Sequence, residues 1–177
     1  DGEYRSRKPR MRMFGKYLAS GEIEPLITYP DNLVESNMGV QYYKTAMVLG
    51  LLRNSVLGVK MFDDAFKQYI ERWAYKHPTP YDFFRTIEDV SGEDLSWFWR
   101  SWIYNNWSLD QSVIDVSYPT DSDENDAVIT IANMKEVPMP VVVEITTESG
   151  VVNRKKLPVE IWTVSYTHLT LPTKSRG

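Results

Sequence analysis

The hydrophobic pattern of this 177-residue chain changes once, near Trp107, and this change limits the folds open to it. Before Trp107, apolar residues recur about every 3.6 residues, which is typical of amphipathic helices. Beyond Trp107 they alternate or run as β-branched stretches, which is typical of strands. The chain is therefore predicted to be α+β. We expect an all-α helical lobe at 1–108, followed by a partial β-sandwich at 109–163.

Helical segments are expected throughout the first 108 residues. The strongest is 41–57, where Tyr42, Ala46 and Leu49 recur at helical spacing and predict a largely buried apolar face. Pro9 is expected to kink or split the first helix. The expected helices are 1–20, 41–57, 62–75, 80–92 and 95–107.

Local signals mark where the last two of these helices begin. Thr79 stands at an N-cap position before Pro80, and Asp82 lies where the acid of a capping box belongs. Asp94 can cap the following helix, which carries a cluster of five large rings. We interpret this cluster as core and domain interface rather than a carbohydrate-stacking surface. The rings are Trp97, Phe98, Trp99, Trp102 and Trp107.

The segment after Trp107 is expected to form strands separated by turns. Residues 148–150, Glu-Ser-Gly, have the composition of a hairpin turn. The acidic loop at 121–126 lacks the regular oxygen-ligand spacing of a calcium loop and is interpreted as solvated. The expected strands are 112–118, 127–132, 140–147 and 151–162.

The last fourteen residues, 164–177, read VSYTHLTLPTKSRG and differ in character from the chain before them. Val164 to Thr173 can be back-translated into the adapter that transposase-based sequencing libraries leave behind. We therefore expect 164–177 to be translated sequencing adapter rather than native sequence. A genuine terminal strand and loop is the alternative. On the adapter interpretation, His168 is not a candidate ligand or base.

Charge and composition argue against several classes of protein. The net charge is -4, so no overall positive field attracts nucleic acid. The basic run at 1–16 is interpreted as a solvated helix face. The absence of cysteine excludes disulfides and thiolate metal sites. No stretch approaches the roughly 20 apolar residues needed to cross a bilayer, so no transmembrane segment is expected.

The stretch YYKTAMVLGLLRNSVLG resembles the helix that follows the zinc site in aminopeptidase N-like zinc metallopeptidases, the gluzincins. Residues 42–45, Tyr-Tyr-Lys-Thr, stand where that family has Tyr-x-Lys-Gly, with threonine in place of the usual glycine. Residues 91–95, Ser-Gly-Glu-Asp-Leu, are similar to a later block of the family. The resemblance covers about 1–162. It implies the C-terminal fragment of a catalytic domain, followed by part of its β domain.

The resemblance implies that the parent protein is a zinc-dependent aminopeptidase, which hydrolyses N-terminal peptide bonds with a zinc-activated water. Tyr42 matches the family's tyrosine, whose phenol stabilises the oxyanion of the tetrahedral intermediate. Tyr43 would take that role only if the register slipped by one. The implied partner is a peptide substrate. The family's His-Glu-x-x-His zinc motif is absent from these 177 residues. We therefore expect the fragment alone to bind no zinc and to be inactive.

Other interpretations stay open at this point. The parent can be a catalytically dead relative that serves as a binding or scaffold module. A free-standing interaction domain would require Asp1 to be a true start, and nucleic-acid binding by the basic first helix conflicts with the acidic net charge. His77, at a helix end, is expected to cap carbonyls or to be solvated rather than to bind metal. The sequence does not fix the compartment, and only analogy with relatives that carry similar β domains suggests export.

Overall fold

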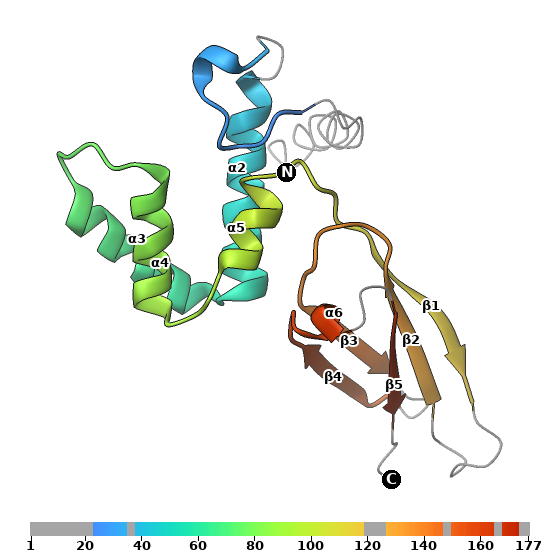
Figure 1. Ribbon diagram of the computed structural model, residues 1–177. Coiled ribbons are helices and arrows are strands. Elements are labelled where there is room, and N and C mark those ends of the chain that lie inside the picture. The colour runs from blue at the N-terminus through green and yellow to red at the C-terminus, as the bar shows by residue number, and fades with distance from the viewer. Residues whose placement is uncertain (1–22, 35–37, 119–126, 147–149, 165–167, 174–177) are drawn as a thin grey trace, which may run out of the picture. The chain divides into compact units, whose positions relative to one another are not determined.

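The chain folds into two compact units, Asp1–Asn106 and Trp107–Gly177 (Figure 1). The first holds helices and the second holds two small antiparallel sheets, so the predicted α+β class is confirmed. The structure is a computed structural model. The residues that it describes are 23–34, 38–118, 127–146, 150–164 and 168–173. The predicted helix at 1–20 and the acidic loop at 121–126 lie outside these residues. The domain assignment 1–108 and 109–163 stays a prediction.

The helices of the first unit follow the predicted order, with bounds that differ by a few residues. A short 3-10 turn, η1, precedes them, and a π-helical turn, η3, extends the first of them. The elements are η1 Pro30–Asn32, α2 Met38–Leu51, η3 Leu52–Val56, α3 Val59–Trp73, α4 Pro80–Ser91 and α5 Ser96–Trp102.

Glycines and a capping box set the bounds of α3 and α4. Gly58 (φ 83°) precedes α3 and Gly92 (φ 71°) follows α4, in backbone conformations that residues with a side chain rarely adopt. The predicted capping box at Thr79 is present. Oδ2 of Asp82 accepts hydrogen bonds from the Thr79 amide at 2.8 Å and from the Thr79 hydroxyl at 2.7 Å. These bonds hold the pKa of Asp82 below its ordinary value.

Helix α5 is shorter than the predicted helix 95–107. Leu95 occupies its N-cap position, and Oδ1 of Asp94 accepts a hydrogen bond from the Ser96 amide at 2.9 Å. The predicted capping aspartate therefore does bind the first turn, although from one position before the N-cap. The helix ends at Trp102 instead of Trp107.

The face that α2 buries differs from the predicted one. Tyr42 and Ala46, which were expected to face inward, are exposed, whereas Lys44, Val48 and Leu52 are buried. The three buried residues recur every four positions and so lie along one narrow side of the helix. Because α2 is apolar around most of its circumference, hydrophobic periodicity alone could not identify this side.

Helix α3 also exposes part of the face predicted to be inward. Phe62 is buried, but Phe66 is 36% exposed and Ile70 is 52% exposed. Helix α3 packs against α4 through Tyr69 and Phe83, whose ring centroids lie 5.0 Å apart. Since this packing covers only one side of α3, Ile70 on its flank faces solvent.

The rings of α4 and α5 form much of the core of the first unit. Phe84 stacks on Trp99 with ring centroids 4.5 Å apart. Phe98 is fully buried, and Trp99 and Trp102 are nearly so. The interpretation of the ring cluster as core is therefore confirmed for Phe98, Trp99 and Trp102, while Trp97 is half-buried.

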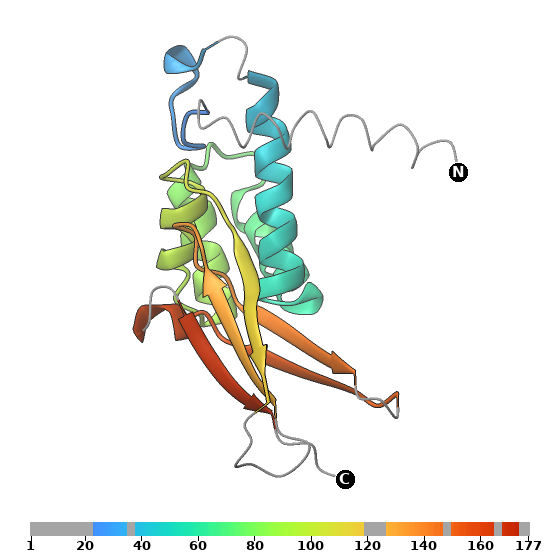
Figure 2. The ribbon, with the colours of Figure 1, turned by 90° about the vertical axis from the view of Figure 1, so that its right-hand side faces the viewer.

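The second unit contains two antiparallel sheets (Figure 2). One has the strand order β1-β2-β5, and the other pairs β3 with β4; the ribbons of the second run across those of the first. A register shift between Val113 and Asp115 interrupts the pairing of β1 with β2. The strands are β1 Gln111–Ser117, β2 Ala127–Asn133, β3 Val141–Thr146, β4 Val152–Leu157 and β5 His168–Thr173.

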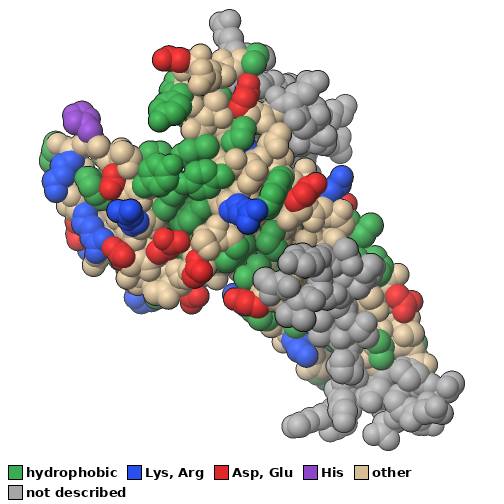
Figure 3. Space-filling model, in the orientation of Figure 1, with side chains coloured by type: hydrophobic (Ala, Val, Ile, Leu, Met, Phe, Trp, Pro, Cys, Tyr) green, Lys and Arg blue, Asp and Glu red, His purple; other side chains and the backbone are tan. Residues whose placement is uncertain are grey.

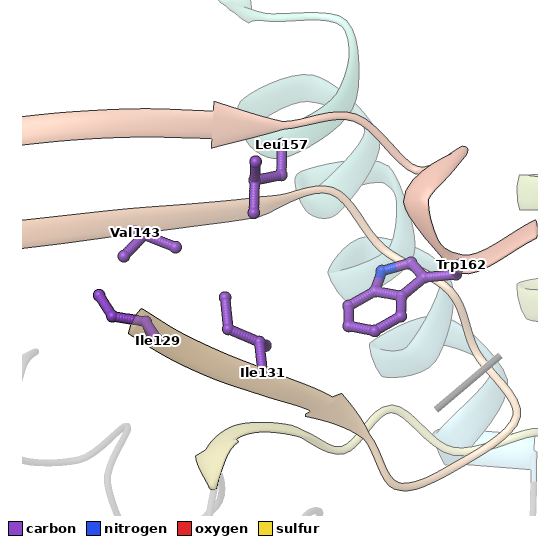
Figure 4. Packing of buried hydrophobic residues seen from close by; sticks show 5 residues of the cluster. All are labelled: Ile129, Ile131, Val143, Leu157 and Trp162. Carbon is purple, nitrogen blue, oxygen red and sulfur yellow. The ribbon is translucent and has the colours of Figure 1, made fainter. Parts of the chain in front are cut away.

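Side chains from both sheets meet in a buried cluster (Figure 4). The cluster consists of Ile129, Ile131, Val143, Leu157 and Trp162. Trp162 lies at one end, where its indole N–H donates to the Met139 carbonyl at 2.8 Å. Apolar side chains that face each other from two sheets are the arrangement of a sandwich core.

The predicted strand 151–162 is wrong beyond Leu157. Pro158 follows β4, and proline has no amide hydrogen to donate to a sheet. The chain then turns into a short helix, α6 (Ile161–Val164), which brings Trp162 into the core.

Strand β5 falls within 164–177, the segment predicted to be adapter sequence. It pairs with β2 from Ala132↔His168 to Ala127↔Thr173. A run of alternating leucine and threonine can pair with an open strand edge whatever its origin, so the adapter assignment stays a prediction. Among the described helices, none is long and apolar enough to cross a membrane.

Candidate functional site

Tyr42, the sequence-predicted catalytic residue, lies in the first half of α2 and points to solvent. It is 78% exposed, and its neighbour Tyr43 is 55% exposed. Both residues sit on a regular helix whose opposite side is anchored in the first unit by Val48 and Leu52. The helical backbone fixes the point from which the Tyr42 side chain extends.

Lys44, two residues further along α2, lies on the buried side. It is 3% exposed, and this burial lowers its pKa from the ordinary lysine value. Residues 42–44 therefore place a phenol and an amine in opposite environments within one turn of helix. Nothing in the sequence indicated this burial beyond the position of Lys44 within an apolar run.

Thr45 stands where the resembled family has glycine, and the fold accommodates it. Its side chain is exposed, and its hydroxyl donates to the Gln41 carbonyl one turn earlier at 2.7 Å. Among the described residues, nothing therefore crowds the threonine. The substitution leaves the helical conformation of residues 42–45 intact.

The described residues do not assemble a metal site. Within this part of the chain, no group of three or more His, Cys, Asp or Glu side chains lies close enough to hold a metal ion. His77 is exposed beyond the end of α3. The role of capping that helix belongs to Lys76, whose Nζ donates to the Arg72 carbonyl at 2.7 Å. The described residues thus do not fit a zinc ion.

The stretch that carries Tyr42 matches a known protein family. A family model described as the peptidase family M1 domain matches residues 17–102, just under half of the chain. The matched stretch includes α2 through α5 and ends with the last residue of α5. A comparison with curated proteins found no match. The chain is therefore related to the aminopeptidase N-like peptidases of family M1.

Proposed function

We propose that the parent of this chain is a zinc-dependent aminopeptidase and that the Tyr42 phenol stabilises the oxyanion formed during peptide hydrolysis. The family match over 17–102 carries this proposal, because it spans the helix on which Tyr42 lies. The exposure of Tyr42 supports it as well. A phenol that is 78% exposed can meet a substrate, whereas a buried core tyrosine cannot.

The chemistry assigned to Tyr42 is donation of one hydrogen bond. Attack of water on the scissile carbonyl creates a tetrahedral intermediate with negative charge on its oxygen. A donor already fixed in place stabilises that charge without having to reorganise at the moment of reaction. The backbone of α2 fixes the point from which the Tyr42 side chain extends, and the buried side of the helix anchors that backbone. Tyr42 is thus the catalytic residue that this chain contributes.

The zinc ion is assigned to a part of the parent outside these 177 residues. The sequence contains no His-Glu-x-x-His motif, and the described residues form no ligand group. In the parent, zinc supplies the Lewis acid that polarises the carbonyl and activates water. We accordingly expect the 177-residue chain to hold no stoichiometric zinc and to leave aminoacyl-nitroanilides uncleaved.

The first experiment is a long DNA read across the native locus. A His-Glu-x-x-His motif followed by a second glutamate, upstream and in frame, supports the peptidase. Substitution of those ligands would instead make the parent a binding or scaffold relative. The same read would settle the origin of 164–177.

The second experiment compares Tyr42→Phe with Tyr43→Phe in the parent enzyme, assayed on an aminoacyl-nitroanilide. We expect Tyr42→Phe to lower kcat by about 10²–10³, the typical cost of removing one oxyanion donor, with zinc content unchanged. Tyr43→Phe is the matched control, since it removes a neighbouring exposed hydroxyl from the same helix, and kcat should change less than about threefold. An unchanged kcat in Tyr42→Phe would remove Tyr42 from the mechanism.

A further inference from the structure

Two donor groups are buried on one side of α2 without an acceptor among the described residues. Lys44 is 3% exposed, and within this part of the chain no hydrogen bond or ion pair engages its ammonium group. The side-chain amide nitrogen of Gln41, Nε2, is also buried and has no hydrogen-bond partner there. A buried donor that loses water without gaining an acceptor costs free energy, so such groups are rare in folded proteins. The pair therefore indicates that an acceptor binds at this place.

Gln41 and Lys44 lie close enough to share one acceptor. They are three residues apart on a regular helix, which places their Cβ atoms about 5–6 Å apart on the same side. Lys44, Val48 and Leu52 continue this side as a buried row along α2 and η3. Gln41 as a whole residue is only half-buried, so the row reaches the surface at its N-terminal end. A group from outside can approach the two side chains there.

The acceptor does not come from α2 itself or from a described acidic residue. Carbonyl oxygens inside a helix already accept hydrogen bonds from amides one turn later, and the Gln41 carbonyl also accepts from the Thr45 hydroxyl at 2.7 Å. Burial lowers the pKa of Lys44, and among the described residues no carboxylate contributes to the shift. The acceptor is therefore supplied from elsewhere.

Several other cations of the first unit have acidic partners at the surface. Arg53 pairs with Asp63 at 2.7 Å, and Lys60 pairs with Asp64 at 2.6 Å. Figure 3 shows Lys and Arg side chains of one face lying at the surface, several of them beside Asp or Glu. Lys44 differs from these cations both in its burial and in having no described carboxylate beside it. Since a buried ammonium group without a counter-charge is costly, a carboxylate is the acceptor that suits it best.

We propose that Gln41 and Lys44 bind the carboxylate of an Asp or Glu side chain that belongs to the parent protein outside these 177 residues. One carboxylate oxygen accepts from the Lys44 ammonium group and the other from the Gln41 amide. The carboxylate also neutralises the ammonium charge, which a water molecule or a backbone carbonyl does not. The contact joins the first half of α2, which carries Tyr42, to another part of the parent. The inference shares with the proposed function a parent longer than this chain, but it depends on no step of catalysis.

The test is hydrogen exchange of α2, read by mass spectrometry, in the parent and in the 177-residue chain with Lys44→Met. In the parent, the variant leaves a buried carboxylate without its partner, so α2 should exchange about 100-fold faster or more. In the 177-residue chain, the same change removes only an unpaired ammonium group, so α2 should exchange about fivefold more slowly. Lys67→Met, at an exposed position of α3, is the control and should change the exchange of α2 less than about threefold in both proteins. Slow exchange in α4 confirms that each variant is folded.

A double-mutant cycle in the parent tests whether the two donors share one group. Gln41→Leu removes the amide while keeping a side chain of similar size, and it should speed the exchange of α2 by about tenfold. If one carboxylate binds both donors, the combined acceleration in the double variant should be smaller than the product of the two single effects, because the second loss finds the contact already broken. A combined effect equal to that product would overturn the shared contact.

Three other outcomes would overturn the proposal. Slower exchange in both proteins would mean that no carboxylate reaches Lys44, and faster exchange in both would mean that its partner lies within the 177 residues. Slower exchange of the unmodified chain in sodium acetate than in sodium chloride, lost in Lys44→Met and without an effect of that variant in the parent, would assign the site to a free carboxylate. None of these measurements depends on zinc or on peptidase activity, so a parent without zinc ligands would contradict the proposed function and leave this inference intact.

Discussion

Among the described residues of the first unit, Lys44 is the charged side chain that is buried. It is 3% exposed, and burial lowers its pKa; among the described residues, no charged partner contributes to the shift. Lys44→Met keeps an unbranched side chain of nearly the same length and removes the cost of burying an ammonium group. We expect the free energy of unfolding at pH 7 to rise by about 1 kcal/mol, measured by urea denaturation. Lys67→Met, at an exposed position of α3, is the control and should have little effect.

The gain from Lys44→Met should depend on pH in a defined direction. The folded-state pKa of Lys44 lies below the ordinary value of 10.5, so the unfolded chain binds the proton more tightly. The stability of the unmodified chain therefore rises as pH increases through the folded pKa toward 10.5. The advantage of the methionine variant is full below the folded-state pKa of Lys44 and shrinks as pH rises from there to 10.5. A constant advantage up to pH 10.5 would show that packing, not charge, causes it.

At the same scale, sequence reasoning could propose Tyr42 only through a family resemblance. A tyrosine on an apolar helix is ordinarily a core residue, and the periodicity of 41–57 assigned Tyr42 to the buried face. The structure instead exposes Tyr42 and buries Lys44. Which side of an apolar helix is buried depends on what packs against it, and that information is not local.

At the scale of elements, the capping box of α4 should make a measurable contribution to stability. Thr79→Ala removes the hydroxyl that donates to Asp82 at 2.7 Å and should lower the free energy of unfolding by about 1 kcal/mol. Thr45→Ala is the matched control. It too removes an exposed threonine hydroxyl with a 2.7 Å bond, but within a helix, where alanine is favoured. Equal losses in the two variants, measured by urea denaturation, would contradict a capping role.

The elements that sequence predicted best are those with local chemical signals. Helix α4 begins where Thr79 provides the N-cap and Pro80 has a φ suited to the first helical position. It ends where Gly92 adopts a left-handed conformation. The element that failed, the strand 151–162, contains Pro158, which ends β4 for an equally local reason. Attention to that proline would have found the boundary. The packing of Trp162 from α6 into the sandwich core could not be found in this way, because it requires residues 129–157 to be folded first.

At the scale of the whole molecule, each of the two units has buried hydrophobic residues of its own. A mutation in the core of one unit should therefore destabilise that unit and leave the other unchanged. Ile131 is 2% exposed in the sandwich cluster, and Phe98 is fully buried among the rings of α4 and α5. Ile131→Val and Phe98→Leu each remove a small apolar volume and should cost about 1 kcal/mol. Hydrogen exchange read by mass spectrometry distinguishes the units. Ile131→Val should speed exchange in β1 to β4 and leave α4 and α5 unchanged, and Phe98→Leu should do the reverse. Faster exchange in both units from either variant would mean that the two units unfold cooperatively. The chain would then change from helices to strands near Trp107 without dividing there into independently unfolding parts.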